Sequence, residues 1–146
     1  MSNELKPQPR INAINRPFWE ACNEDKLHIQ QCQSPNCGKW AYFPRVCCPH
    51  CGSGDLAWKD ASGEGEIKTF AVIRRPQHPS FFPEAPYYLI AVQLKEGPLM
   101  YSRLQHPYEQ GLELVGRKVS VTFTDHGPQQ RLPFFVLQED SGAAVV

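Results

Sequence analysis

The segment Cys32-Gln-Ser-Pro-Asn-Cys37, followed by Cys48-Pro-His-Cys51-Gly52, decides the fold of the first part of this chain. Its two cysteine pairs have the spacings Cys-x4-Cys and Cys-x2-Cys and are separated by ten residues. Such pairs can place four thiolates around one tetrahedral ion, and zinc takes this geometry without a redox role. A glycine directly after the last cysteine is typical of the tight turns, or knuckles, of zinc ribbons. The pattern therefore predicts a zinc ribbon whose ligands are Cys32, Cys37, Cys48 and Cys51.

The expected zinc is structural. Four thiolates fill the tetrahedron and leave no position for a reactive water molecule. A small ribbon also has too little core to fold alone, so metal binding supplies folding free energy. Two cysteines remain outside this motif. Cys22 falls in an amphipathic stretch, where we expect a buried apolar side chain. Cys47 adjoins a ligand, but the Cys-x2-Cys spacing favours Cys48 as the companion of Cys51.

The charge of the chain is balanced. Its 146 residues include fifteen Lys plus Arg and fifteen Asp plus Glu, for a formal net charge of zero. A nucleic-acid binder usually has a basic excess, because phosphate neutralisation supplies most of its affinity. The balance therefore argues against nucleic acid as the partner, although zinc ribbons often bind it.

No apolar run reaches the roughly 18 residues of a membrane span. The polar start, residues 1–10, lacks the apolar core of a signal peptide. We therefore expect a cytoplasmic chain without a membrane contact. In that reducing compartment, closely paired cysteines indicate metal ligands rather than disulfides.

The chain divides into four predicted parts. We expect residues 1–15 to form a flexible arm and residues 141–146 to form a tail. Residues 16–61 hold a short helix and the ribbon: Pro17 suits a first helical turn, and helical periodicity continues to about Asp25. Residues 62–140, which begin with the turn-forming Ser62-Gly63-Glu64-Gly65, form the second domain.

This second domain is predicted to be a barrel. Its apolar, alternating stretches are separated by turn residues and show no helical period. Five strands of this kind suggest an oligonucleotide/oligosaccharide-binding (OB) fold. The expected strands are Glu66–Arg74, Tyr87–Leu94, Leu99–Leu104, the stretch around Val119, Val121 and Phe123, and Phe134–Gln138.

A long loop, Arg74–Pro86, joins the first two barrel strands and contains four prolines. Loops of this length are often functional or mobile. Phe81 and Phe82 could pack on the barrel, or they could contact a partner protein or an acyl ligand. Arg74 and Arg75 could be ordinary surface charges, or they could hold phosphates, with Arg103 and Arg117-Lys118 adding to the patch. The ribbon aromatics Trp40, Tyr42 and Phe43 are further candidates for partner contact.

Catalytic groups are scarce. The sequence lacks Gly-x-Ser-x-Gly, His-Glu-x-x-His and a phosphate loop. Its histidines are scattered and have no acidic neighbours in the sequence that would form a catalytic pair. We therefore expect a chain that is not an enzyme by itself.

Several motifs together resemble the DUF35 family of zinc-ribbon plus OB-fold proteins associated with acyl-CoA metabolism. The resemblance covers residues 16–137. It departs from the family in the first cysteine pair, which the family usually spaces by two residues. The motifs are Phe18-Trp19-Glu20, Leu27…Gln31-Cys32, Cys37-Gly38, Phe43-Pro44-Arg45, Cys48-Pro49-His50-Cys51-Gly52-Ser53, Gly65, Pro86-Tyr87…Ala91-Val92…Leu94, Glu96-Gly97 and Val115-Gly116…Val119…Val121…Phe123.

The resemblance implies a mostly β fold: an N-terminal helix, a rubredoxin-like zinc ribbon and a C-terminal OB barrel. It also implies a non-catalytic subunit that stabilises a thiolase-superfamily partner, such as a thiolase, an acyltransferase or a sterol-carrier-type aldolase. Such a subunit can help shape the acyl-CoA site, so contact with acyl-CoA is possible. The alternative is a stand-alone nucleic-acid-binding module, because zinc ribbons and OB-folds both serve that role elsewhere.

Overall fold

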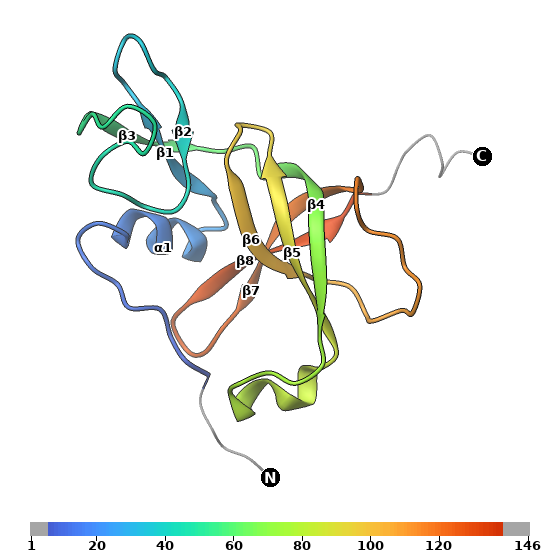
Figure 1. Cartoon of the computed structure of the whole chain (residues 1–146). Helices are drawn as coiled ribbons and strands as arrows, with labels where there is room; N and C mark the ends of the chain where they lie inside the picture. The colour runs from blue at the N-terminus through green and yellow to red at the C-terminus, as the bar shows by residue number, and fades with distance from the viewer. Residues whose placement is uncertain (1–5, 139–146) are drawn as a thin grey trace.

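Two β-sheets carry most of the chain and are joined through residues 61–63 (Figure 1). The computed structural model describes residues 6–138. The first sheet has the strand order β2-β1-β3 and is antiparallel throughout. It consists of β1 (His28–Cys32), β2 (Trp40–Ala41) and β3 (Leu56–Asp60). This sheet is the predicted ribbon.

The helix α1 (Arg16–Asn23) precedes the ribbon. Proline stands in its first turn, where no backbone N–H is needed. Its buried residues Phe18, Ala21 and Cys22 follow the helical period that the sequence showed. The helix contacts both β1 and the barrel strand β8 (Arg131–Leu137), so it lies between the two sheets (Figure 1).

The second sheet closes into a barrel with the order β4-β5-β6-β8-β7. The pair β6–β8 is parallel and the other pairs are antiparallel. Five strands in a closed Greek-key barrel are the OB-fold that the sequence predicted. The remaining strands are β4 (Glu64–Ile73), β5 (Tyr87–Leu94), β6 (Leu99–Leu104) and β7 (Lys118–Asp125).

The predicted turn over 62–65 is wrong in its second half. Glu64 and Gly65 already belong to β4, where they pair with Ser120 and Val119 of β7. Gly65 also pairs with Leu94 of β5. A Cβ on Gly65 would lie 2.5 Å from Val92 Cγ1 and 2.6 Å from the carbonyl oxygen of Gln93. Here glycine permits a close backbone approach inside a strand rather than a turn.

The long loop contains a 3₁₀ helix, η1 (Pro79–Glu84), which the sequence did not indicate. The His78 side chain caps it by accepting a hydrogen bond from the backbone N–H of Ser80 at 3.2 Å. The loop is therefore an ordered element at one end of the barrel (Figure 1).

One hydrophobic core serves both sheets. Phe18 of α1 and Ile29 of β1 are buried in the same cluster as Ile67, Tyr88 and Phe135 of the barrel. Because the cluster is continuous, the ribbon and barrel share part of their stabilisation by burial.

Residues 6–15 also contact the barrel. Lys6 forms an ion pair with Glu84, and the backbone oxygen of Pro7 lies 2.7 Å from His126 Nε2. The predicted division of the chain into four parts stays a prediction, and the tail 141–146 lies outside the described residues. Within residues 6–138, no helix is long and apolar enough to cross a membrane.

Candidate metal centre and surrounding surfaces

The structure brings together the four cysteines of the ribbon motif. Their Sγ atoms all lie within 4.8 Å of one another. The sulfurs of Cys32 and Cys51 are 3.6 Å apart, and those of Cys37 and Cys48 are 3.8 Å apart. A tetrahedral zinc site with Zn–S bonds of about 2.3 Å has S···S edges of roughly 3.8 Å. The donor set therefore fits one tetrahedral thiolate-bound ion.

Two loops supply these sulfurs. Cys32 ends β1, and Cys37 follows in a turn closed by its N–H to the Ser34 carbonyl at 3.1 Å. This turn accommodates the two residues by which the first pair exceeds the usual spacing. Cys48 and Cys51 form the second knuckle, where Gly52 N–H donates to Cys48 O at 2.9 Å and Gly52 has a φ of 83°.

Backbone donors prepare Cys48 for the thiolate state. Desolvation by burial raises its pKa, but backbone N–H groups of Cys51 and His50 donate to its sulfur and bring the pKa down to about 7. The His50 donor lies 3.4 Å from Sγ. Hydrogen bonds to the charged form favour that form, so this sulfur is already arranged as a metal ligand.

The other two cysteines differ from the cluster and from each other. Cys47 is exposed and does not belong to the cluster. Cys22 is fully buried in the core, which confirms its expected apolar role, and burial raises its pKa to about 12.

Phe81 and Phe82 of the long loop have different environments. Phe81 stacks on buried His126 at a centroid distance of 6.2 Å, and the Lys6 ammonium lies 5.3 Å from its ring centroid. Phe82 is 55% exposed. Phe81 therefore anchors the loop, while Phe82 is presented to solvent.

Arg117 and Lys118 lie apart from the other candidate basic residues. Arg74 donates from Nη2 to Tyr108 Oη at 2.9 Å, and Arg75 is exposed beside it. Both follow the end of β4, whereas Lys118 pairs with Glu66 at the beginning of that strand. The prediction that Arg117-Lys118 would extend the patch is wrong, because β7 places them at the opposite end of β4.

The ribbon aromatics pack around α1. Phe43 is 42% exposed, and its ring centroid lies 5.9 Å from that of Phe18. Trp40 and Tyr42 are half-buried against the core. Among these three, Phe43 offers the most exposed surface.

A pocket that the sequence did not indicate lies at the η1 end of the barrel. Its volume is about 330 Å³. Arg103 reaches it from β6, with its guanidinium carbon 3.9 Å from the Tyr87 ring centroid and Nη1 2.6 Å from Glu84 Oε1. The lining also includes Tyr108 of the loop after β6. In the sequence, the aromatic residues of Tyr87-Tyr88 and Pro107-Tyr108 were the feature that could have indicated a binding surface. Only the closed barrel brings these two segments together.

Three histidines have structural partners, and a fourth, His106, lines the pocket. His126 is buried next to Pro7 and Phe81. His78 Nδ1 lies 2.7 Å from Ser80 Oγ. His28 of β1 lies 2.5 Å from Asp60 of β3. None of these pairs lies at the cysteine cluster or lines the pocket.

Comparison with known proteins identifies the family. One family model, described as the ChsH2 rubredoxin-like zinc ribbon domain, matches residues 19–57. A second, described as the ChsH2 C-terminal OB-fold domain, matches residues 58–124. A solved structure of an Ltp2-ChsH2(DUF35) aldolase contains a similar chain with a TM-score of 0.77 and 33% identity, covering 89% of this chain and 98% of that one. This chain belongs to the DUF35 family.

Two curated relatives of this DUF35 chain match it over only part of their own lengths. A probable enoyl-CoA hydratase alpha subunit of Thermomonospora curvata is 35% identical over 140 residues, which is 94% of this chain and 42% of that protein. A DUF35 domain-containing scaffold protein of Pyrococcus furiosus is 40% identical over 85 residues, or 53% of this chain and 61% of that protein. The chain thus spans less than two thirds of either relative.

Proposed function

We propose that this DUF35 chain is a non-catalytic accessory subunit of an acyl-CoA-processing complex whose catalytic partner is a thiolase-superfamily enzyme. The observation that carries the proposal is the similarity to a chain of the Ltp2-ChsH2(DUF35) aldolase structure, which covers 89% of this chain and 98% of that one. The names of the two curated relatives, a hydratase subunit and a scaffold protein, are consistent with it. The partner would be a thiolase, an acyltransferase or a sterol-carrier-type aldolase.

The chemistry of the described residues supports a non-catalytic role. Four thiolates around one ion complete its tetrahedron, so the ion has no open position for substrate. His28, His78 and His126 are held by carboxylate, hydroxyl, backbone and aromatic neighbours. In this proposal the partner supplies the catalytic groups, and the DUF35 chain stabilises it and helps to shape its acyl-CoA site.

The ion in this proposal is structural Zn²⁺. Its ligands Cys32, Cys37, Cys48 and Cys51 would fix the ribbon beside α1. A reducing compartment such as the cytoplasm keeps these thiols available for the metal.

Two exposed aromatic positions are proposed partner contacts. Phe82 lies on η1, in the loop that begins at Arg74, and Phe43 lies on the ribbon. Because Phe81 is an internal anchor, its replacement would disturb the loop itself, so Phe82→Ala is the sharper test. We expect this variant to retain less partner in co-purification, while Val115→Ala, at a residue 63% exposed elsewhere, retains all of it. Equal retention by both variants would remove Phe82 from the interface.

The decisive experiment is gentle affinity purification of the tagged chain from its native host, with mass spectrometry of co-eluting proteins. A thiolase-superfamily enzyme in stoichiometric amount is the expected result. Elution with nucleic acid and without such an enzyme would favour a nucleic-acid-binding module instead. Acyl-CoA turnover by the isolated chain would contradict the non-catalytic role.

A further inference from the structure

The β5–β6 hairpin is apolar on both of its faces. Ile90 and Met100 point into the core and are 1% exposed, whereas Leu89, Leu99 and Tyr101 are 41%, 40% and 65% exposed. We call these last three residues the hairpin face. Tyr101 pairs with Ala91, so Leu89 is its diagonal neighbour, and Leu99 lies two residues away on the same side. Three large apolar side chains are thus gathered on one outer surface of a barrel.

The pocket continues this hairpin face. Arg103 is the cross-strand partner of Leu89, and it also lines the pocket together with Tyr87. The Arg103 guanidinium carbon lies 3.9 Å from the Tyr87 ring centroid, and the Arg103 side chain remains 20% exposed. Tyrosine and arginine are enriched at the centres of protein interfaces, and the exposed leucines add apolar area beside them.

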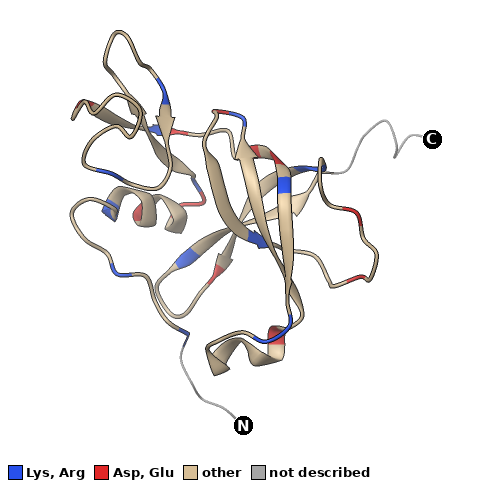
Figure 2. Cartoon of the chain, viewed as in Figure 1, with Lys and Arg blue, Asp and Glu red and all other residues tan. Residues whose placement is uncertain are grey.

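Basic residues border the η1 side of this surface. Lys6, Arg74 and Arg75 lie there with Arg103, and Glu84 pairs with both Lys6 and Arg103. Figure 2 shows the corresponding blue segments around η1 with a red segment in η1 itself. The chain as a whole is neutral, so this is a local basic excess.

We propose that the hairpin face and the pocket form a docking surface for a protein partner that inserts an apolar or aromatic side chain into the pocket and places acidic residues against Arg74 and Arg75. This inference rests on the proposed function, because the occupant is the enzyme subunit of that complex. It adds a second contact area, continuous with Phe82 through the segment 83–87.

Size and charge favour this occupant over others. A volume of about 330 Å³ lies at the lower limit of small-molecule sites, which span roughly 300–1,000 Å³, and it suits one or two side chains. A second copy of the chain, packed by two-fold symmetry, would present this same surface, in which the acid beside the arginines, Glu84, is already paired with Lys6 and Arg103. Nucleic acid would match the basic border but would leave the leucines of the hairpin face without apolar contact.

The test combines cross-linking with charge insertion in the full chain, expressed in its native host. The photoreactive residue p-benzoylphenylalanine replaces Tyr101 in one sample and Val115 in a control. Val115 is comparably exposed, at 63%, and lies in the loop before β7. We expect cross-linking to the co-purified acyl-CoA-processing enzyme from position 101 and none from position 115. Tyr101→Glu should weaken binding of that enzyme at least tenfold, and Val115→Glu should leave it unchanged.

The other outcomes separate the two proposals. If the enzyme co-purifies, does not cross-link from position 101 and binds Tyr101→Glu normally, the docking surface is wrong and the accessory role stands. If position 101 cross-links to a second copy or to nucleic acid and no such enzyme co-purifies, both proposals are overturned. A thermal melt of Tyr101→Glu that matches the unmodified chain shows that lost binding does not reflect unfolding.

Discussion

Cys22 and Cys47, the cysteines outside the metal cluster, have opposite surroundings and should have opposite reactivities. Thiolates are the reactive form, so burial that raises the pKa of Cys22 to about 12 suppresses its reaction, while Cys47 is open to solvent. With zinc bound, we expect one rapidly alkylated thiol, at Cys47, when iodoacetamide labelling is followed by peptide mass spectrometry.

The matched variant for this prediction is Cys47→Ser, which should show no rapid alkylation while the metal is bound. Chelation should then expose the four cluster thiols, whereas Cys22 reacts only after global unfolding. Rapid labelling of Cys32, Cys37, Cys48 or Cys51 in the zinc-loaded protein would contradict the assigned ligand set.

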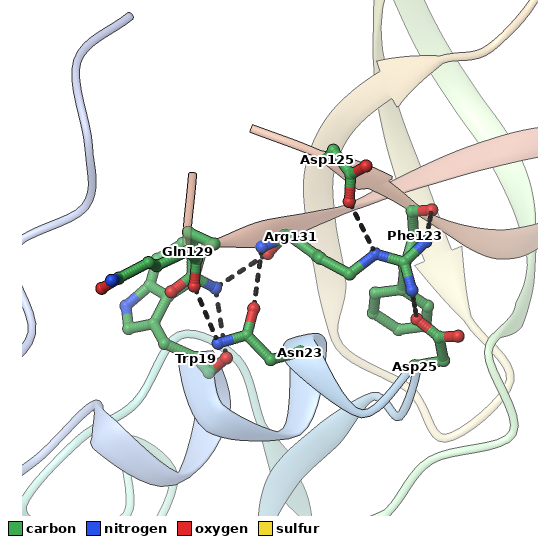
Figure 3. Close-up of polar contacts among 8 residues, drawn as sticks. Trp19, Asn23, Asp25, Phe123, Asp125, Gln129 and Arg131 are labelled. Atoms are coloured by element: carbon green, nitrogen blue, oxygen red, sulfur yellow. Dashed lines mark hydrogen bonds and ion pairs between the residues drawn. The ribbon is translucent and has the colours of Figure 1, made fainter. Parts of the chain in front are cut away.

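At the scale of elements, the contact between α1 and the β7–β8 hairpin depends on Asn23 (Figure 3). Its Oδ1 accepts from the Arg131 backbone N–H at 2.8 Å, and its Nδ2 donates to the Gln129 carbonyl at 3.3 Å. Asn23→Ala should lower the free energy of unfolding by about 0.5–1.5 kcal/mol, because two hydrogen bonds are lost near the surface. Urea unfolding measures this change.

Asn36→Ala is the control for this contact, because Asn36 is an exposed residue of the ribbon turn. We expect its urea midpoint to equal that of the unmodified chain. A midpoint for Asn23→Ala that also stays unchanged would show that the buried contacts of the helix and the hydrogen bond from Gln130 Nε2 to the Trp19 carbonyl hold it without Asn23.

Sequence periodicity was a reliable guide to these elements where it reflected burial. The strands β5 and β6 have their predicted bounds, because alternating apolar residues and flanking turn residues mark where each strand begins and ends. Four cysteines at knuckle spacing likewise indicated their own cluster. Elements of this kind can be predicted from the sequence because the pattern that indicates them lies within one segment.

Features that depend on contacts between distant segments could not be predicted from the sequence. The ion pair of Lys6 with Glu84 joins the arm to η1, and no spacing rule connects residues so far apart in the chain. The assignment of Arg117-Lys118 to the patch of Arg74 and Arg75 was wrong for the same reason. The sequence does not show that Arg74 and Lys118 lie at opposite ends of β4. The pocket likewise exists only because closure of the barrel brings 84–87 beside 103–108.

At the scale of the whole molecule, the shared core links the ribbon to the barrel. Ile29 and Leu27 precede the metal knuckles and are buried in the cluster that contains Ile67 and Phe135. Removal of the metal should release the ribbon strands first, because metal binding supplies their folding free energy. We expect hydrogen exchange to increase most over residues 28–60 and less over the barrel strands, with a lower barrel melting temperature because part of its core is lost. Hydrogen exchange that stays equally slow over residues 28–60 and the barrel strands after chelation would contradict a folding role for the metal.

Acid should loosen the attachment of the arm and η1 to the barrel. Burial raises the pKa of Glu84, but the hydrogen bonds from Lys6 and Arg103, together with their charges, outweigh it and hold that pKa below its usual value. Because the folded-state pKa is depressed, the stabilisation is present above the unfolded value, about 4.3, and is lost as pH falls through the folded value.

These charges are partly exposed, so Glu84→Gln should cost about 1 kcal/mol or less at pH 7. Its melting temperature should therefore lie below that of the unmodified chain at pH 7, and the difference should shrink as the pH falls through the folded-state pKa of Glu84. Glu113→Gln, at an exposed glutamate, should follow the unmodified chain at every pH. A difference for Glu84→Gln that persists unchanged into acid would mean that the carboxylate stabilises the loop by packing rather than by charge.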